Sequence, residues 1–282
     1  MKISSITEQQ IQTGGSAVNL KLAITTYSIG SRKIKNNCKI VFASDLHECD
    51  TDIILSEMRK YAPDMTVVPG DFVHRENTWK KGAEFLRSTA EFSRAFCSIG
   101  NHDRGIYDIS MRVIKDARAE LLDNEYTEYK SVKIGGLSSP KVKKEMSPLG
   151  HTPPPDSISW LDEFESQEGF KLLLCHHPEH FDRFIKGRDI DLTLSGHAHG
   201  GQWRIFGRGV FAPGQGIFPK YTSGVYADGH FIVGRGLGNP HLIPRINNDP
   251  ELIFIDLFYD SDSDLSIKKS VRTVRQKHAK IH

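Results

Sequence analysis

The clearest signal of the fold is Lys39-Ile-Val-Phe-Ala-Ser-Asp45-Leu-His47. An apolar run of strand length ends in a turn that carries a carboxylate and an imidazole. The same arrangement recurs four times along the chain, each time with polar residues just past a strand. The four are Val68-Pro-Gly-Asp71, Ser98-Ile-Gly-Asn101-His102-Asp103, Leu174-Cys-His176-His177-Pro178 and Leu194-Ser-Gly-His197-Ala-His199-Gly-Gly-Gln202.

Strands and helices alternate outward from this stretch, which predicts an α/β fold. Residues 126–137 are typical of a hairpin, and the Gly-rich residues 203–238 predict further hairpins. The expected strands are 19–29, 39–43, 65–68, 95–99, 170–175, 190–194 and 251–258. The expected helices are 51–61, 78–92, about 108–119 and 158–167.

The five turns are expected to meet, because open α/β sheets bind ligands at the carboxyl ends of their strands. Gly70, Gly100 and Gly196 are expected to let the backbone turn sharply there. Asp-x-His and His-x-His place two side chains on the same side of an extended backbone. We therefore expect one site built from segments that span more than half the chain.

The ligand types at these turns are carboxylate, imidazole and amide, a mixture that suits zinc, iron or manganese. Seven candidate ligands exceed what one tetrahedral ion needs, so the sequence favours a pair of ions. One such turn alone is common by chance, whereas five in order are not. Eight further histidines are interpreted as surface or hydrogen-bonded residues: 74, 151, 177, 180, 230, 241, 278 and 282.

Composition excludes several classes of protein. The chain has 282 residues, 38% hydrophobic and 26% charged, which is ordinary for a globular protein. A net charge of +2 gives no overall field for nucleic acid, so no nucleic-acid partner is expected. Four cysteines without a Cys-x-x-Cys pair favour reduced thiols. Because neither a bilayer-spanning run nor a signal-peptide pattern is found, a cytoplasmic protein is expected.

The five segments resemble the five-block signature of the calcineurin-like metallophosphoesterases, over about residues 19–258. Gly196–Gln202, Lys220–Gly224, Arg235–Asn239 and Pro250–Ile255 resemble the bacterial YkuE/YaeI-like branch, which includes UDP-diacylglucosamine pyrophosphohydrolases. The resemblance implies a four-layer sandwich of two mixed β-sheets flanked by helices.

The resemblance also implies a role for each site residue. One metal ion is expected on Asp45, His47 and His199, a second on Asn101, His176 and His197, and Asp71 is expected to bridge them. His102 is expected to face the substrate phosphate, with Asp103 orienting it. Many family members carry an acidic residue where this chain has His74.

The function that follows is hydrolysis of a phosphodiester, phosphomonoester or pyrophosphate bond, with two divalent ions (Mn, Fe or Zn) activating a bridging hydroxide. A UDP-diacylglucosamine-type pyrophosphohydrolase is the specific alternative. A nuclease would need a basic groove that follows several phosphates. A non-catalytic module on the same fold would typically lack some of the ligands, and every one is present here.

The ends of the chain are expected to lie outside a single domain formed by residues 19–260. Residues 1–18 are polar and predicted to be disordered. Residues 261–282 form a basic tail, with six Lys or Arg after residue 264. This tail is expected to be solvated and disordered, or to contact a membrane weakly. The expected partner is a phosphorylated small molecule or a lipid-linked nucleotide.

Overall fold

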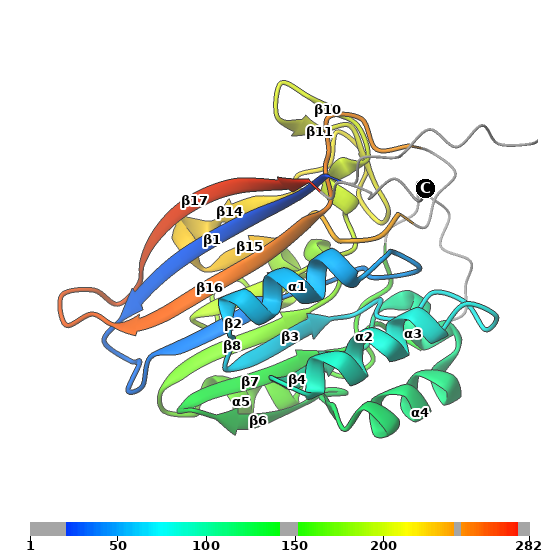
Figure 1. The fold of residues 1–282 in the computed structure, drawn as a ribbon. Helices are drawn as coiled ribbons and strands as arrows, with labels where there is room; N and C mark the ends of the chain where they lie inside the picture. Colours follow the sequence, from blue (N-terminus) through cyan, green and yellow to red (C-terminus); the bar gives the residue numbers. More distant parts are fainter. Residues whose placement is uncertain (1–20, 142–151, 240–243, 276–282) are drawn as a thin grey trace, which may run out of the picture.

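Two mixed β-sheets form the centre of the computed structural model, which describes residues 21–141, 152–239 and 244–275 (Figure 1). The first sheet contains, in spatial order, β17 (Ser266–Arg275), β1 (Lys21–Ser31), β16 (Glu251–Tyr259), β2 (Cys38–Phe42), β3 (Met65–Pro69), β4 (Arg94–Ser98) and β5 (Glu120–Leu121). The second contains β14 (Gly224–Tyr226), β15 (Phe231–Val233), β9 (Leu192–Ser195), β8 (Phe170–Cys175), β7 (Val132–Leu137) and β6 (Glu125–Tyr129).

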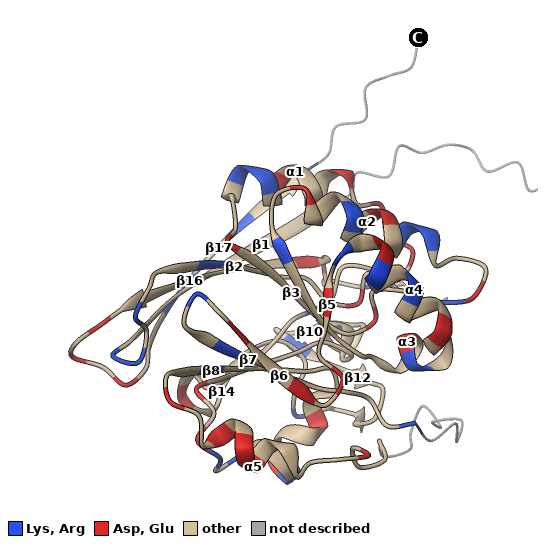
Figure 2. Ribbon diagram, turned by 90° about the horizontal axis from the view of Figure 1, so that it is seen from below, with Lys and Arg blue, Asp and Glu red and all other residues tan. Residues whose placement is uncertain are grey.

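Helices cover the outer face of each sheet. Figure 2 shows α1 and α2 on one side of the sheets and α5 on the opposite side. The helices of the first side are α1 (Asp52–Tyr61), α2 (Lys80–Ala90) and α4 (Tyr107–Ala117). Those of the second side are α5 (Trp160–Glu165), η1 (Pro178–His180) and η2 (Phe181–Ile185). The expected four-layer sandwich with two mixed sheets is therefore confirmed.

Strand periodicity assigns each apolar side chain to a layer. In β2, Ile40 and Phe42 lie in the core between the sheets, whereas Val41 packs with the helices. In β8, Leu172 and Leu174 lie between the sheets, and Leu173 packs against the opposite layer. All six side chains are buried, because both faces of both sheets are covered. This is why the strands are continuous apolar runs in the sequence.

Parallel pairing brings the candidate turns to one edge. β2, β3 and β4 are parallel neighbours, and so are β8 and β9 in the other sheet. Backbone hydrogen bonds tie the first two turns together, from Asp45 N to Gly70 O at 3.3 Å and from Leu46 N to Asp71 O at 2.9 Å. The turns therefore meet although they are far apart in the sequence.

Shorter elements follow the turns. α3 (Asn101–Gly105) starts directly after β4 and was not expected from the sequence. The Gly-rich region forms the expected hairpins from short strands. Its short strands are β10 (Arg204–Ile205), β11 (Arg208–Gly209), β12 (Phe211–Ala212) and β13 (Gly216–Ile217), and its short helices are η3 (His199–Gly201) and η4 (Ala227–Gly229).

The expected basic tail is wrong for residues 266–275. These residues form β17, which pairs antiparallel with β1 from Gly30↔Ser266 to Lys21↔Arg275. Its backbone bonds to the edge of β1, and Arg272 forms an ion pair of 2.7 Å with Glu57 of α1. The basic side chains stay exposed, so their charge did not oppose strand formation. The expected disordered residues 1–18, and residues 276–282, lie outside the described residues.

Of the helices in the described ranges, none combines the length and the apolar character that crossing a bilayer requires.

Candidate metal centre

Two groups of buried side chains form at the shared edge of the sheets. In the first group, ligand atoms of Asp45, His47 and His199 lie within 4.8 Å of one another. His47 Nε2 is 3.4 Å from His199 Nε2, and His199 Nε2 is 3.5 Å from Asp45 Oδ1. These are the three residues predicted to share one metal ion.

The second group contains Asp71, His176 and His197, whose ligand atoms also lie within 4.8 Å of one another. Asn101 joins it, with Oδ1 3.1 Å from His176 Nε2. The other ring nitrogen of His176, Nδ1, donates to the Pro69 carbonyl at 2.9 Å and so orients the ring. The structure thus brings all four predicted residues together.

Asp71 lies between the two groups. Its Oδ2 is 3.2 Å from His176 Nε2 and 3.8 Å from His47 Nε2. Its Oδ1 accepts a hydrogen bond from the backbone N–H of His102 at 2.9 Å. One carboxylate oxygen therefore faces both groups, as a bridging ligand would.

The donor set fits a pair of divalent cations. It offers four imidazoles, two carboxylates and an amide oxygen, and all these residues are buried except the half-buried Asn101. His47 Nδ1 and His197 Nε2 are buried without a hydrogen-bond partner among the described residues. Two imidazole nitrogens that face each other at 3.4 Å are a poor arrangement without a shared proton or cation.

The backbone of the ligand turns is left-handed rather than extended, contrary to expectation. Five ligands have positive φ, a backbone conformation that is uncommon for residues other than glycine. They are Asp45 (52°), His47 (46°), Asp71 (54°), His197 (65°) and His199 (45°). Each pair of side chains converges because the chain coils after the strand, not because it continues as a strand.

The glycines at these turns serve two different purposes. Gly70 has the expected left-handed φ of 91°. Gly100 and Gly196 are instead required by close approach. A Cβ on Gly100 would lie 2.1 Å from Asp71 Oδ1, and a Cβ on Gly196 would lie 2.3 Å from Asp45 Oδ2. The expectation of a sharp turn thus holds for Gly70, and the other two make room for carboxylates.

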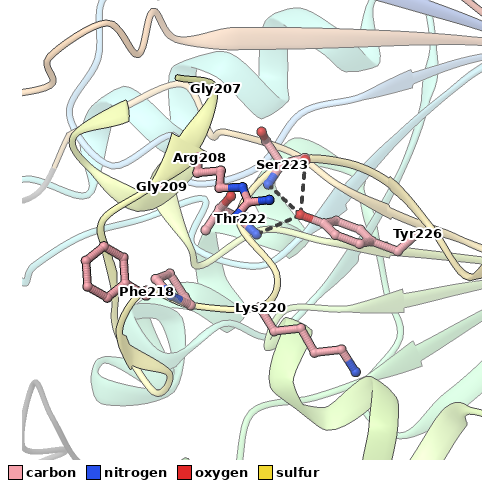
Figure 3. A pocket seen from close by; sticks show the side chains of 9 residues that line it. Gly207, Arg208, Gly209, Phe218, Lys220, Thr222, Ser223 and Tyr226 are labelled. Carbon is pink, nitrogen blue, oxygen red and sulfur yellow. Dashed lines mark hydrogen bonds between the residues drawn. The ribbon is translucent and has the colours of Figure 1, made fainter. Parts of the chain in front are cut away.

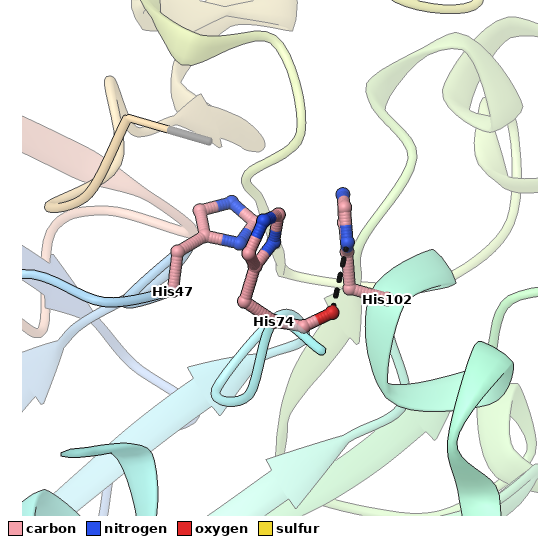
Figure 4. A group of neighbouring side chains, drawn as sticks. All are labelled: His47, His74 and His102. Atoms are coloured by element: carbon pink, nitrogen blue, oxygen red, sulfur yellow. Dashed lines mark hydrogen bonds between the residues drawn. The ribbon is translucent and has the colours of Figure 1, made fainter. Parts of the chain in front are cut away.

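His102 points toward the metal-ligand cluster from the start of α3. Its ring centroid lies 4.8 Å from that of His47, and its Nδ1 is 3.2 Å from the His74 carbonyl oxygen (Figure 4). A carbonyl only accepts, so Nδ1 carries a proton and Nε2 is the ring nitrogen left for chemistry. His102 as a whole is half-buried.

Asp103 does not orient His102, and this expectation is wrong. Its carboxylate accepts hydrogen bonds from the backbone N–H groups of Asp71 at 2.6 Å, Val73 at 3.0 Å and Gly100 at 2.9 Å. As the third residue of α3, Asp103 turns back toward the helix start. Burial and the nearby Asp71 carboxylate raise its pKa to about 8. Asp103 therefore supports the Asp71 turn.

The electrostatics of the buried cluster centre on Asp71. Burial lowers the pKa of His47 and of His197 well below the usual range. Burial opposes ionisation of Asp71, but positive charge on His176 and His102 outweighs it and holds the Asp71 pKa well below its usual value. Burial likewise disfavours a charged His176, yet Asp71 raises its pKa to about 10. A cation bound here would take the place of that proton.

Two histidines that we interpreted as surface or hydrogen-bonded residues lie beside the candidate metal ligands. His74 is buried, and one of its ring nitrogens lies within 4.8 Å of a ring nitrogen of His47 and of His102 (Figure 4). His177 lies within the same limit of Glu179 and His197, and its Nε2 is 2.8 Å from Ser139 Oγ. The sequence signal was proximity, since His177 follows a ligand and His74 lies three residues after one.

The remaining histidines outside the motifs divide into two sets. His180 and His230 are hydrogen-bonded as expected, to the carbonyl oxygens of Pro153 at 3.0 Å and Asp191 at 2.9 Å. His151, His241, His278 and His282 lie outside the described residues.

Residues from a distant loop also support His199, a contact that no sequence pattern indicated. Asn248 Nδ2 donates to the His199 carbonyl at 2.7 Å. An Arg245 guanidinium nitrogen lies 3.3 Å from His199 Nδ1, and the same side chain donates to the Arg235 carbonyl at 2.8 Å. This loop therefore fixes one ligand from behind.

The sequence matches known proteins over the same segments. The profile of the calcineurin-like phosphoesterases matches residues 38–201. The metallophosphoesterase YkuE of Bacillus subtilis is 29% identical over 78% of this chain and 78% of its own. The phosphodiesterase YaeI of Escherichia coli is 28% identical over 78% and 82%. YpbG of Bacillus subtilis is 25% identical over 82% and 85%.

The matched residues 38–201 run from the strand before Asp45 to the turn that carries His199, so they contain every predicted ligand. They also make up more than half of the chain. This protein belongs to the calcineurin-like phosphoesterase family.

Proposed function

We propose that this hydrolase cleaves a phosphoric diester with the help of two divalent metal ions. Family membership makes it a phosphoester hydrolase. The observation that carries the two-metal proposal is the position of Asp71 Oδ2, which faces His176 at 3.2 Å and His47 at 3.8 Å. A single oxygen between two separate ligand groups is the geometry of a bridge.

The ligands divide between the two ions as the groups divide in space. Asp45, His47 and His199 would hold one ion. Asn101, His176 and His197 would hold the other, with Asp71 shared. When bound, such a pair supplies a water nucleophile at neutral pH and positive charge against phosphoryl oxygens. Zinc, iron and manganese suit this mixture of imidazole and carboxylate.

His102 is the residue proposed to act on the substrate. Its Nδ1–H is held by the His74 carbonyl, so Nε2 is the ring nitrogen left to act on the substrate. In the imidazolium form, Nε2–H would hydrogen-bond a phosphoryl oxygen or give its proton to the departing oxygen. The neutral form has only a lone pair there, so this role requires the protonated ring.

A diester is the substrate class to test first, because the relative YaeI carries the name phosphodiesterase. A nuclease receives less support. In the view of Figure 2, acidic and basic segments are interspersed along the helices, whereas a nucleic-acid groove needs a continuous basic surface. The four cysteines are all free, which supports a reducing, cytoplasmic location as part of the proposal.

The test is an activity matrix on the purified full chain. Manganese, zinc, iron and magnesium would each be combined with an aryl monoester, an aryl diester and a nucleoside-diphosphate conjugate. We expect diester hydrolysis that a chelator removes and manganese, zinc or iron restores. Bound metal would be measured by elemental analysis in the same samples. Two bound ions without hydrolysis of any substrate would contradict the proposed function, and one bound ion with full activity would contradict the two-metal centre.

A further inference from the structure

Exposed apolar side chains gather on one small surface. Eight large apolar residues are exposed in the described part of the chain, and six lie on the two hairpins after η3 or directly beside them. We call these six the hairpin surface: Trp203, Ile205, Phe206, Ile217, Phe218 and Ile246. A concentration of this kind marks an interaction site more often than scattered single residues do.

Two exposed phenylalanines stand on these hairpins, Phe206 at the tip of the first and Phe218 at the open end of the second. Phe206 lies in the turn between β10 and β11 and is 102% exposed, and Phe218 follows β13 and is 79% exposed. Both have positive φ, 49° and 55°. Turn chemistry favours Gly, Asn or Asp in such positions, so local folding does not account for two aromatic residues. Figure 1 shows the β10–β11 hairpin standing out from the rest of the molecule.

Backbone hydrogen bonds fix the hairpin surface beside the metal centre. Phe218 N donates to Val210 O at 2.8 Å, and Val210 N donates to Trp203 O at 2.9 Å, which joins the two hairpins. In addition, the guanidinium of Arg204 donates to the Gly200 carbonyl at 2.8 Å, within the short helix that carries His199. Whatever binds the hairpin surface is therefore held next to the candidate ligands.

The segment that carries the two hairpins has charged side chains of one sign. Residues 203–224 contain three basic residues, Arg204, Arg208 and Lys220, and no acidic one. Arg208 and Lys220 line an open pocket of about 460 Å³ that Phe218 also borders (Figure 3). Lys220 forms an ion pair of 2.6 Å with Asp182, so Arg208 is the freer of the two charges. Exposed apolar and basic side chains thus lie beside one another on the hairpins.

We propose that the hairpin surface docks on an anionic lipid bilayer. Aromatic side chains favour the boundary between headgroups and acyl chains, and nearby Arg and Lys attract anionic headgroups. The apolar residues are exposed at separate points of the two hairpins, which suits insertion into a fluid layer better than a fitted protein interface. Docking would bring the metal centre to the membrane surface. The inference concerns binding and does not depend on the proposed hydrolysis.

Sedimentation of the full chain with vesicles tests the proposal. We expect binding to phosphatidylglycerol-containing vesicles at about 0.05 M salt, weaker binding at about 0.5 M, and little binding to pure phosphatidylcholine. The double variant Phe206→Ser/Phe218→Ser should bind at least about tenfold more weakly, because the inserted apolar area is lost. Arg208→Glu should weaken binding only to anionic vesicles.

Matched controls separate this surface from general stickiness. Tyr259→Ser/Val271→Ser removes the other two exposed apolar side chains, which lie on β16 and β17, and should bind like the natural chain. Thermal unfolding would show that both double variants fold. Fluorescence of Trp203, which is 43% exposed, should be quenched by brominated lipid acyl chains. A natural chain that stays in the supernatant with anionic vesicles, or a phenylalanine variant that binds undiminished, would overturn the proposal. The proposal would also be overturned if the phenylalanine variant lost self-association rather than vesicle binding, since the hairpin surface would then pair two copies of the chain.

Discussion

Asp71 is the residue on which the proposed centre depends most. It combines a bridging position with contacts to three other parts of the site, through His176, His47 and the backbone of His102. Asp71→Asn keeps the size but removes the charge that two cations would share. We expect fewer than two bound metal ions per chain and activity lower by at least about a hundredfold.

Elemental analysis and diester turnover would be measured on the same preparation of the Asp71→Asn variant. Asp116→Asn is the control, since that carboxylate is exposed on α4 and should leave both quantities unchanged. Full metal occupancy with near-normal turnover in the Asp71 variant would rule out the bridging role.

His102 should differ from the ligands in its effect. His102→Ala is expected to keep both metal ions and to lower kcat by about a hundredfold or more, because the side chain acts on substrate. The loss should be smaller for an aryl diester than for an alkyl diester, since a good leaving group needs little protonation. Rates with a series of leaving groups would measure this.

His74→Ala is the matched control for His102. It keeps the backbone carbonyl that positions Nδ1 of His102 at 3.2 Å and removes only the neighbouring ring. A smaller loss than in His102→Ala is expected. An equal loss across all leaving groups in His102→Ala would replace proton donation with phosphate binding as the role of that residue.

The short helix α3 presents Asn101 and His102, and one ion pair anchors it. Arg104 Nη2 lies 2.9 Å from Asp123 Oδ1, and Arg104 Nε donates to the Ser139 carbonyl at 3.0 Å. The Arg104 side chain is only 9% exposed. Burial opposes ionisation of Asp123, but hydrogen bonds and the charge of Arg104 lower its pKa below the ordinary 3.8.

Asp123→Asn should therefore reduce the free energy of unfolding by about 2 kcal/mol at pH 7, because it leaves Arg104 without its counter-charge. A lowered folded-state pKa stabilises the protein fully above the ordinary value, and that contribution disappears as the pH falls through the folded value. The difference between the two proteins should be constant above about pH 5 and shrink toward zero below 3.8. Urea unfolding at several pH values would measure it, and a difference that grows as the pH falls would contradict the assignment.

β17 is the edge strand of the first sheet and covers the side of β1 that faces away from β16. Its pairing with β1 joins residues near the two ends of the described chain, and the ion pair between Arg272 and Glu57 ties it to α1. Without β17, the N–H and C=O groups along one side of β1 would be unpaired, which favours aggregation.

A chain that ends at Ser261 should accordingly unfold at a temperature at least about 5 °C lower and aggregate more readily. A chain that ends at Arg275 keeps β17 and is the control, with a melting temperature equal to that of the full chain. Calorimetry and light scattering would compare the three. Equal stability of the Ser261 chain would mean that β17 contributes little to the sheet.

The α/β class, the order of the elements and the turns that carry the ligands can all be predicted from the amino-acid sequence. These features are local. An apolar strand run such as Lys39–Ala43 and the polar turn after it are neighbours in the chain, so periodicity and residue type reveal them. The identities of Asp45, His47, Asp71 and the other candidate ligands followed from that pattern together with the family resemblance.

How those residues meet depends on long-range packing, which the sequence pattern does not reveal. The tertiary structure placed His74 beside His102, turned Asp103 toward the Asp71 backbone, and paired the basic strand β17 with β1. It also showed that Gly100 and Gly196 are needed for the close approach of carboxylates. Each of these is a contact between segments far apart in the chain or a backbone angle imposed by packing. A sequence pattern records which groups are available, whereas long-range packing selects the partners they face.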